Sequence, residues 1–141
     1  MTLRRWQRVA AYGICQDEAG RVLLARGSPL SDEPGRWYLP GGGVDHSEEP
    51  EAAVVRELRE EAGLEVAVGE LLAVLADTER PPGRDMQVHS VRIVYRVRVL
   101  GGTLRNEVGG STDLVAWFDP AQARALALMP YVERALRLLD P

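Results

Sequence analysis

The sequence predicts an α/β fold in which a mixed β-sheet is flanked by helices on both faces. Two observations lead to this expectation. Short apolar or alternating segments, typical of strands, lie on both sides of one well-delimited amphipathic helix at residues 50–62, and further helices are predicted near the C-terminal end. The chain has 141 residues, enough for one core, so we expect residues 1–141 to form a single domain.

The remaining elements follow from local patterns of alternation, glycine and proline. Strands are expected at 8–16, 21–26, 37–39, 65–75, 87–100 and 114–118. Turns or loops are expected at 17–20, 27–35, 41–43, 80–84, 101–102 and 106–113, and residues 103–105 form a candidate edge strand. Two helices are predicted near the end of the chain, one beginning at Pro120 and the other spanning 130–139, because proline suits the first turn of a helix.

The helix at 50–62 gathers acidic side chains on one face. Pro50 suits its first turn, and Gly63 suits the left-handed conformation that ends a helix. At about 100° per residue, Glu57, Glu60 and Glu61 share one face, whereas Val55, Leu58 and Ala62 form the apolar stripe on the other.

Like charges at this spacing oppose helix formation unless a cation lies among them. Three carboxylates provide the hard oxygen ligands that Mg²⁺ or Mn²⁺ prefers. The alternative is an ordinary solvated acidic face, because Arg56 and Arg59 are interleaved with the glutamates. The Gly41–Gly43 segment before the helix favours the metal site, since glycine lets the backbone approach a ligand closely.

Residues 42–64 resemble the signature of the Nudix hydrolases at every defined position. The matching residues are Gly42, Glu48, Arg56, Glu57, Leu58, Glu60, Glu61, Gly63 and Leu64, and the preceding segment 37–41 is similar to the family's lead-in. The resemblance implies an α/β/α sandwich and hydrolysis of a pyrophosphate bond in a nucleoside diphosphate linked to another group. Substrates like ADP-ribose and nucleoside triphosphates both remain open; Pro81 and Pro82 lie about where ADP-ribose-cleaving relatives carry a proline.

The resemblance also suggests roles for individual residues. Glu57, Glu60 and Glu61 are expected to hold Mg²⁺ or Mn²⁺, and the family pattern adds the backbone carbonyl of Gly41. Arg56 is expected to orient these carboxylates. A further signature residue, Glu48, is expected either to reach the metal through a water or to brace the loop.

Two other groups of residues are candidates for the reaction. The general base is Glu107 or Asp113 in a later loop, or Glu61 in the helix, because relatives differ on this point. Arginines in or beside loops near the signature are candidates for binding substrate phosphates. They are Arg26, Arg36 and Arg84.

Composition excludes several classes of function. The net charge of −4 argues against a general nucleic-acid binder. No apolar run is long enough to span a membrane, and the single cysteine, Cys15, fits a reducing cytoplasm.

A homodimer is plausible by resemblance alone. Two alternatives are a catalytically silent nucleotide sensor and an isomerase of isoprenoid diphosphates; the second needs a catalytic cysteine, and Cys15 lies in an apolar strand.

Overall fold

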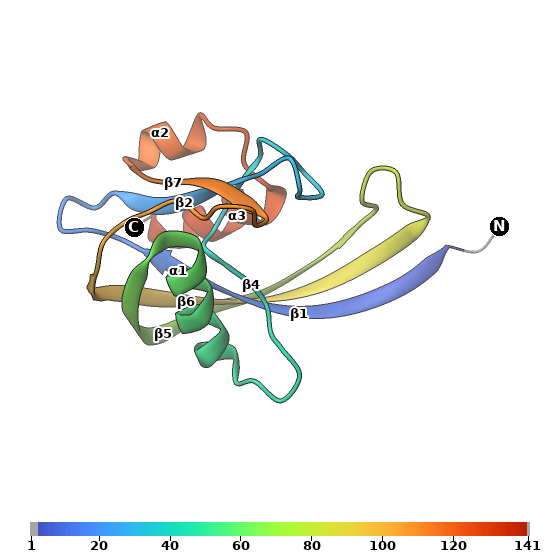
Figure 1. Cartoon of the computed structure of the whole chain (residues 1–141), viewed down its shortest axis with the longest axis horizontal. Helices are drawn as coiled ribbons and strands as arrows, with labels where there is room; N and C mark the ends of the chain where they lie inside the picture. Colours follow the sequence, from blue (N-terminus) through green and yellow to red (C-terminus); the bar gives the residue numbers. More distant parts are fainter. Residues whose placement is uncertain (1–2, 141) are drawn as a thin grey trace.

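Two β-sheets form the framework of the computed structural model, which describes residues 3–140 (Figure 1). The larger sheet has the strand order β4-β1-β6-β5, and the smaller sheet has the order β3-β2-β7. β1 and β6 are parallel and all other neighbours are antiparallel, so the larger sheet is mixed, as predicted. The strands are β1 (Arg4–Cys15), β2 (Val22–Gly27), β3 (Trp37–Tyr38), β4 (Gly41–Gly43), β5 (Leu64–Glu79), β6 (Met86–Gly102) and β7 (Thr112–Phe118).

Three strands are longer than local patterns indicate, because distant segments pair along their whole length. β1 begins at Arg4, where it already pairs with Met86 of β6. The ends of β1, β5 and β6 nearest the loop 80–85 therefore extend well beyond the helices (Figure 1). The turn predicted at 101–102 is wrong: both glycines belong to β6 and pair with the start of β5. The edge strand predicted at 103–105 is not formed.

Helices cover both faces of the larger sheet, which confirms the predicted sandwich. Helix α1 (Pro50–Ala62) has the predicted bounds, and Gly63 ends it in the left-handed conformation with φ 71°. Odd-numbered residues of β1, such as Ala11 and Cys15, pack toward α1; even-numbered residues pack toward α3 (Pro130–Leu136) on the other face. Helix α3 is shorter than predicted, because residues 137–139 form a 3₁₀ turn. The remaining helix is α2 (Pro120–Arg124).

The inner face of α1 differs by one position from the predicted stripe. Leu58 and Ala62 are fully buried as expected, but Val55 is only half-buried. Val54 takes the inward position in its place. The helix is therefore rotated slightly relative to the predicted wheel.

The segment Gly41–Gly43 is a strand, β4, rather than the predicted turn. It lies at the edge of the larger sheet, antiparallel to β1. The Val44 N–H donates to Val9 O, and the Gly13 N–H donates to Pro40 O. Because hydrogen-bonded pairs alternate along an antiparallel ladder, the N–H and C=O groups of Gly41 and Gly43 point away from β1. They are available to side chains of α1: the Gly41 N–H donates to Glu61, and Gly43 O accepts from Arg56.

Within residues 3–140, no helix is both long enough and apolar enough to cross a membrane.

Candidate active site

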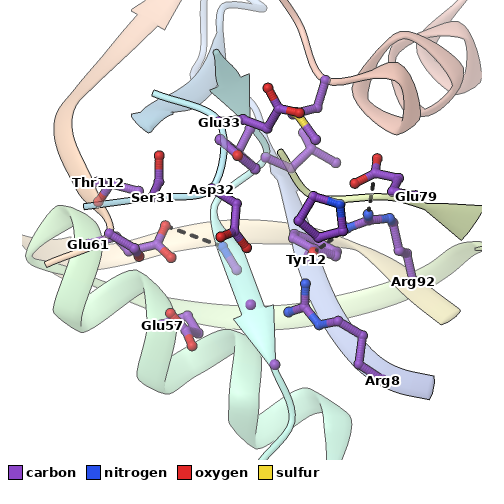
Figure 2. Close-up of a pocket in the computed structure, with 18 of the residues that line it drawn as sticks. Arg8, Tyr12, Ser31, Asp32, Glu33, Glu57, Glu61, Glu79, Arg92 and Thr112 are labelled. Atoms are coloured by element: carbon purple, nitrogen blue, oxygen red, sulfur yellow. Dashed lines mark hydrogen bonds and ion pairs between the residues drawn. The ribbon is translucent and has the colours of Figure 1, made fainter. Parts of the chain in front are cut away.

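A pocket of about 380 Å³ opens where α1 meets β4 and β1. Figure 2 shows Glu57 and Glu61 projecting from α1 on one side of β4, with Arg8 and Tyr12 of β1 on the other. The loop between β2 and β3 contributes Asp32 and Glu33 to the opposite wall. The pocket therefore combines the glycine strand and the helix of the signature with segments outside the signature.

Glu61 is buried, although it lies on the helix face opposite the predicted apolar stripe. Its side chain lies against β4, where the Gly41 N–H donates to Oε2 over 3.4 Å, and only 4% of the residue is exposed. Burial, followed by the adjacent Glu57 carboxylate, raises the pKa of Glu61 well above its usual value. Tertiary packing explains the difference, because the β4 edge covers this part of the helix.

The oxygens gathered here fit a divalent cation. Glu57 and Glu61 place two carboxylates side by side, and the backbone of Gly41 lies beside them, with its N–H donating to Glu61 Oε2 and its polar groups on the side away from β1. Two adjacent, partly buried carboxylates repel each other unless positive charge lies between them, and hard oxygens suit Mg²⁺ or Mn²⁺.

Glu60 lies apart from this pair. Its side chain is 51% exposed and stands 3.5 Å from Arg56 Nη1. In the part of the chain that the structure describes, no group of three or more His, Cys, Asp or Glu side chains gathers at one point. The structure therefore brings together Glu57, Glu61 and Gly41 from the predicted ligand set, but not Glu60.

Arg56 connects the helix, the loop before it and β4. Its guanidinium donates to both carboxylate oxygens of Glu48 at 2.9 and 3.0 Å, and to Gly43 O at 3.1 Å. Nη1 also donates to Glu57 Oε1 at 3.1 Å. The hydrogen bond from Arg56 lowers the pKa of Glu48. This geometry fits the expected positioning role of Arg56. Glu48 also accepts from the Asp45 N–H at 3.0 Å, which fits the expected brace for the loop.

The two later base candidates lie in different environments. Burial, followed by the charges of Glu57 and Glu60, raises the pKa of Glu107, although the nearby backbone N–H groups of Thr112 and Ser111 lower it in part. Asp113 instead accepts a hydrogen bond from Arg26 Nε at 2.9 Å. Glu107 therefore lies near the signature glutamates, whereas Asp113 is engaged with Arg26.

Only one of the three predicted phosphate-binding arginines lines the pocket. Arg84 does, and its guanidinium is 3.1 Å from Asp32. Arg26 of β2 is paired with Asp113 of β7, and Arg36 donates to Leu128 O, so both guanidinium groups are engaged elsewhere and neither lines the pocket.

Sequence reasoning does not identify Arg8 or Arg92 as pocket residues, and it offers Tyr12 only as a candidate for stacking a base. Arg8 and Tyr12 share one face of β1, and Arg92 lies on the neighbouring strand β6. Arg92 is buried over the Tyr131 ring, 4.1 Å from its centroid, and donates to Tyr12 Oη at 2.7 Å and to both oxygens of Asp77. The period-two spacing of Arg8 and Tyr12 is a signal for a common face, but only the pairing with β4 shows that this face lines a pocket.

Comparisons with known proteins point to one family. The family model described as "NUDIX domain" matches residues 6–139. A MutT-like protein of Streptomyces ambofaciens is 33% identical over 132 residues, which cover 94% of this chain and 77% of the relative. A CTP pyrophosphohydrolase of Escherichia coli is 34% identical over 111 residues, covering 79% of this chain and 76% of the relative.

One solved structure and a further sequence relative give the same result. A MutT NUDIX hydrolase from Burkholderia pseudomallei has a TM-score of 0.77 and 29% identity, and the match covers 95% of this chain and 98% of that one. An ADP-ribose pyrophosphatase of Methanocaldococcus jannaschii is 39% identical in sequence over 112 residues, covering 79% of this chain and 61% of the relative. The chain therefore belongs to the Nudix family, and it is a Nudix pyrophosphohydrolase.

Proposed function

We propose that this protein uses a divalent cation, Mg²⁺ or Mn²⁺, to hydrolyse the pyrophosphate bond of a nucleoside diphosphate linked to another group. The observation that carries the proposal is the juxtaposition of the Glu57 and Glu61 carboxylates with the backbone of Gly41 at the wall of the pocket. Relatives named for CTP and for ADP-ribose differ in what the diphosphate carries, so the pyrophosphate bond is their common feature.

Glu57 and Glu61 would hold the cation, with Gly41 as a backbone ligand. When bound, a divalent cation neutralises phosphate oxygens and makes an attacking water more acidic. Arg56 holds Glu57 in place through its hydrogen bond and fixes β4 through Gly43 O. Phosphoryl transfer depends mainly on such positioning and on charge neutralisation.

Glu107 is the stronger of the two loop candidates for the general base. It lies near the paired glutamates, and its raised pKa suits a group that accepts a proton near neutral pH. Asp113 is already committed to Arg26. We expect Glu107→Gln to lower kcat by about 100-fold or more, within the usual range for a lost acid–base group, and Asp113→Asn to have a much smaller effect. Small, equal losses would return the role to Glu61.

The test is phosphate release by the purified protein with Mg²⁺, using a coupled phosphatase. The panel contains ADP-ribose, dinucleoside polyphosphates, nucleotide sugars, and ordinary and oxidised nucleoside triphosphates, including CTP. Glu61→Gln is the inactivating variant, and Glu51→Gln, on an exposed part of the same helix, is the matched control. Hydrolysis that is lost in Glu61→Gln alone supports the proposal. Nucleotide binding without hydrolysis of any member would replace it with a sensing function.

A further inference from the structure

We infer that Arg8 binds a phosphate group of the substrate's diphosphate, across β4 from the paired glutamates. This inference rests on the proposed function for the identity of the ligand, but its geometry does not depend on catalysis. Figure 2 shows the Arg8 side chain leaving β1 and reaching along β4 toward the middle of the pocket.

The absence of side chains on β4 makes this position possible. A Cβ atom added to Gly43 would lie 3.5 Å from Arg8 Nη2, so the guanidinium rests against the bare backbone. A Cβ added to Gly42 would lie 2.8 Å from Glu57 Oε1. Because successive residues of a strand face opposite sides, the glycine strand separates Arg8 from Glu57 by only its own thickness. A diphosphate lying along β4 can therefore contact both sides.

Charge balance in the pocket selects Arg8 among its arginines. Arg92 is neutralised by Asp77, with hydrogen bonds of 2.7 and 3.1 Å, and Arg84 is 3.1 Å from Asp32. Among the ion pairs formed by residues 3–140, none includes Arg8. The pocket wall also carries Glu33, Glu57, Glu61 and Glu79. Such a pocket repels an anion unless a bound cation and an arginine outside any ion pair offset its negative charge.

The chemistry of the two sides is complementary. On the Glu57 side, the divalent cation of the proposed function would contact the phosphate oxygens. On the Arg8 side, the phosphate oxygens need a positively charged hydrogen-bond donor from the protein. A guanidinium supplies two parallel N–H groups that match two oxygens of one phosphate or of adjacent phosphates. Because the proposed cation and Arg8 lie on opposite sides of β4, the ligand class that contacts both is a diphosphate or a longer polyphosphate.

The same strand offers a matched control. Arg4 lies on the same face of β1 as Arg8, because they are four positions apart, but its guanidinium stacks over Trp6 at 5.1 Å and does not line the pocket. Replacing either arginine removes one positive charge from the same strand. Only the change at Arg8 removes a donor from the pocket.

The experiment is calorimetric titration with methylenediphosphonate, a diphosphate analogue that cannot be hydrolysed, in the presence of Mg²⁺. The full-length wild type is compared with Arg8→Ala, Arg8→Lys and Arg4→Ala. We expect Arg8→Ala to weaken binding by about tenfold or more, as for the loss of a charge-assisted hydrogen bond. Arg8→Lys should recover part of the affinity, and Arg4→Ala should bind as the wild type does.

The inference is overturned if the wild type does not bind the analogue, if Arg8→Ala stays within twofold of the wild type, or if Arg4→Ala loses as much. Circular dichroism of each variant establishes that it is folded. Binding that depends on Arg8 in a protein that hydrolyses no nucleotide would support the inference while refuting the proposed function, so the two can fail separately.

Discussion

Cys15 illustrates how burial at a single residue excludes a function. It packs in the apolar layer between β1 and α1 with no exposed surface, and burial, together with the charge of Asp17, raises the pKa of its thiol to about 11. A raised pKa means that the thiol stays protonated until the pH approaches that value, so almost no thiolate exists near neutrality. This argues against the isomerase alternative, which requires a reactive cysteine.

We therefore expect Cys15 to resist iodoacetamide at pH 8 (about three units below its pKa) in the native protein. Unfolding in guanidinium chloride should expose the thiol, return its pKa to the ordinary range and allow rapid labelling. Mass spectrometry of both samples measures the outcome. Rapid labelling of the native protein would show that the region between β1 and α1 opens readily.

Gly42 and Gly41 lie in one short strand, but substitutions at the two positions should change different properties. A change at Gly42 should lower kcat, and a change at Gly41 should lower stability. A Cβ at Gly42 would meet the flexible end of Glu57, 2.8 Å away, so Gly42→Ala should displace that carboxylate and leave the fold intact. We expect kcat to fall by about 100-fold, the usual scale for a misplaced catalytic group, with little change in Tm.

Gly41→Ala should behave differently. Gly41 has φ 143°, and a Cβ there would lie 2.2 Å from the backbone oxygen of Ala11, which cannot move aside easily. This variant should unfold at a clearly lower temperature. Equal Tm values for the two variants would contradict the assigned geometry of β4.

At the level of secondary structure elements, α1 was predictable and β4 was not, for a physical reason. Pro50 and Gly63 set the ends of α1 through local backbone preferences, so the sequence alone specifies its bounds. The glycines of β4 have no strand preference of their own and become extended because β1 pairs with them. The same nonlocal pairing extends β1, β5 and β6 beyond their predicted ends, and the β4 edge buries Glu61.

The end of α1 provides a test of these local and nonlocal effects. Gly63 and Gly83 both have positive φ, 71° and 73°. A Cβ at Gly63 would lie 2.6 Å from Thr103 O, whereas a Cβ at Gly83 would meet nothing within 4 Å. Gly83→Ala should cost about 1–2 kcal/mol of the free energy of unfolding, the cost of the left-handed conformation alone. Gly63→Ala should cost clearly more in urea titrations, and equal losses would mean that the loop at Thr103 adapts without strain.

At the level of the whole molecule, the pocket exists only because distant parts of the chain meet. The signature supplies α1 and most of β4, but Arg8 and Tyr12 come from β1, Arg92 from β6, and Asp32 from the loop between β2 and β3. A signature within 23 residues therefore predicts the metal-binding side of the site and leaves the opposite side undetermined. That opposite side is where substrates of related enzymes would be distinguished, since it is built from loops and strands outside the signature.

Metal binding should be visible in the stability of the whole fold, because any ligand that binds only the native state stabilises it. At a Mg²⁺ concentration of about 100 times the Kd, the stabilisation is about 2.7 kcal/mol, which corresponds to a rise in Tm of roughly 10 °C for a domain of this size.

Glu61→Gln removes one of two adjacent carboxylates. Without metal it should therefore be at least as stable as the wild type, because the repulsion is relieved, yet Mg²⁺ should not raise its Tm. Thermal unfolding of the wild type, Glu61→Gln and the exposed control Glu51→Gln, each with and without MgCl₂, measures both effects. A wild-type Tm that ignores Mg²⁺, or a Glu61→Gln variant that responds like the control, would show that the cation is held elsewhere or not at all.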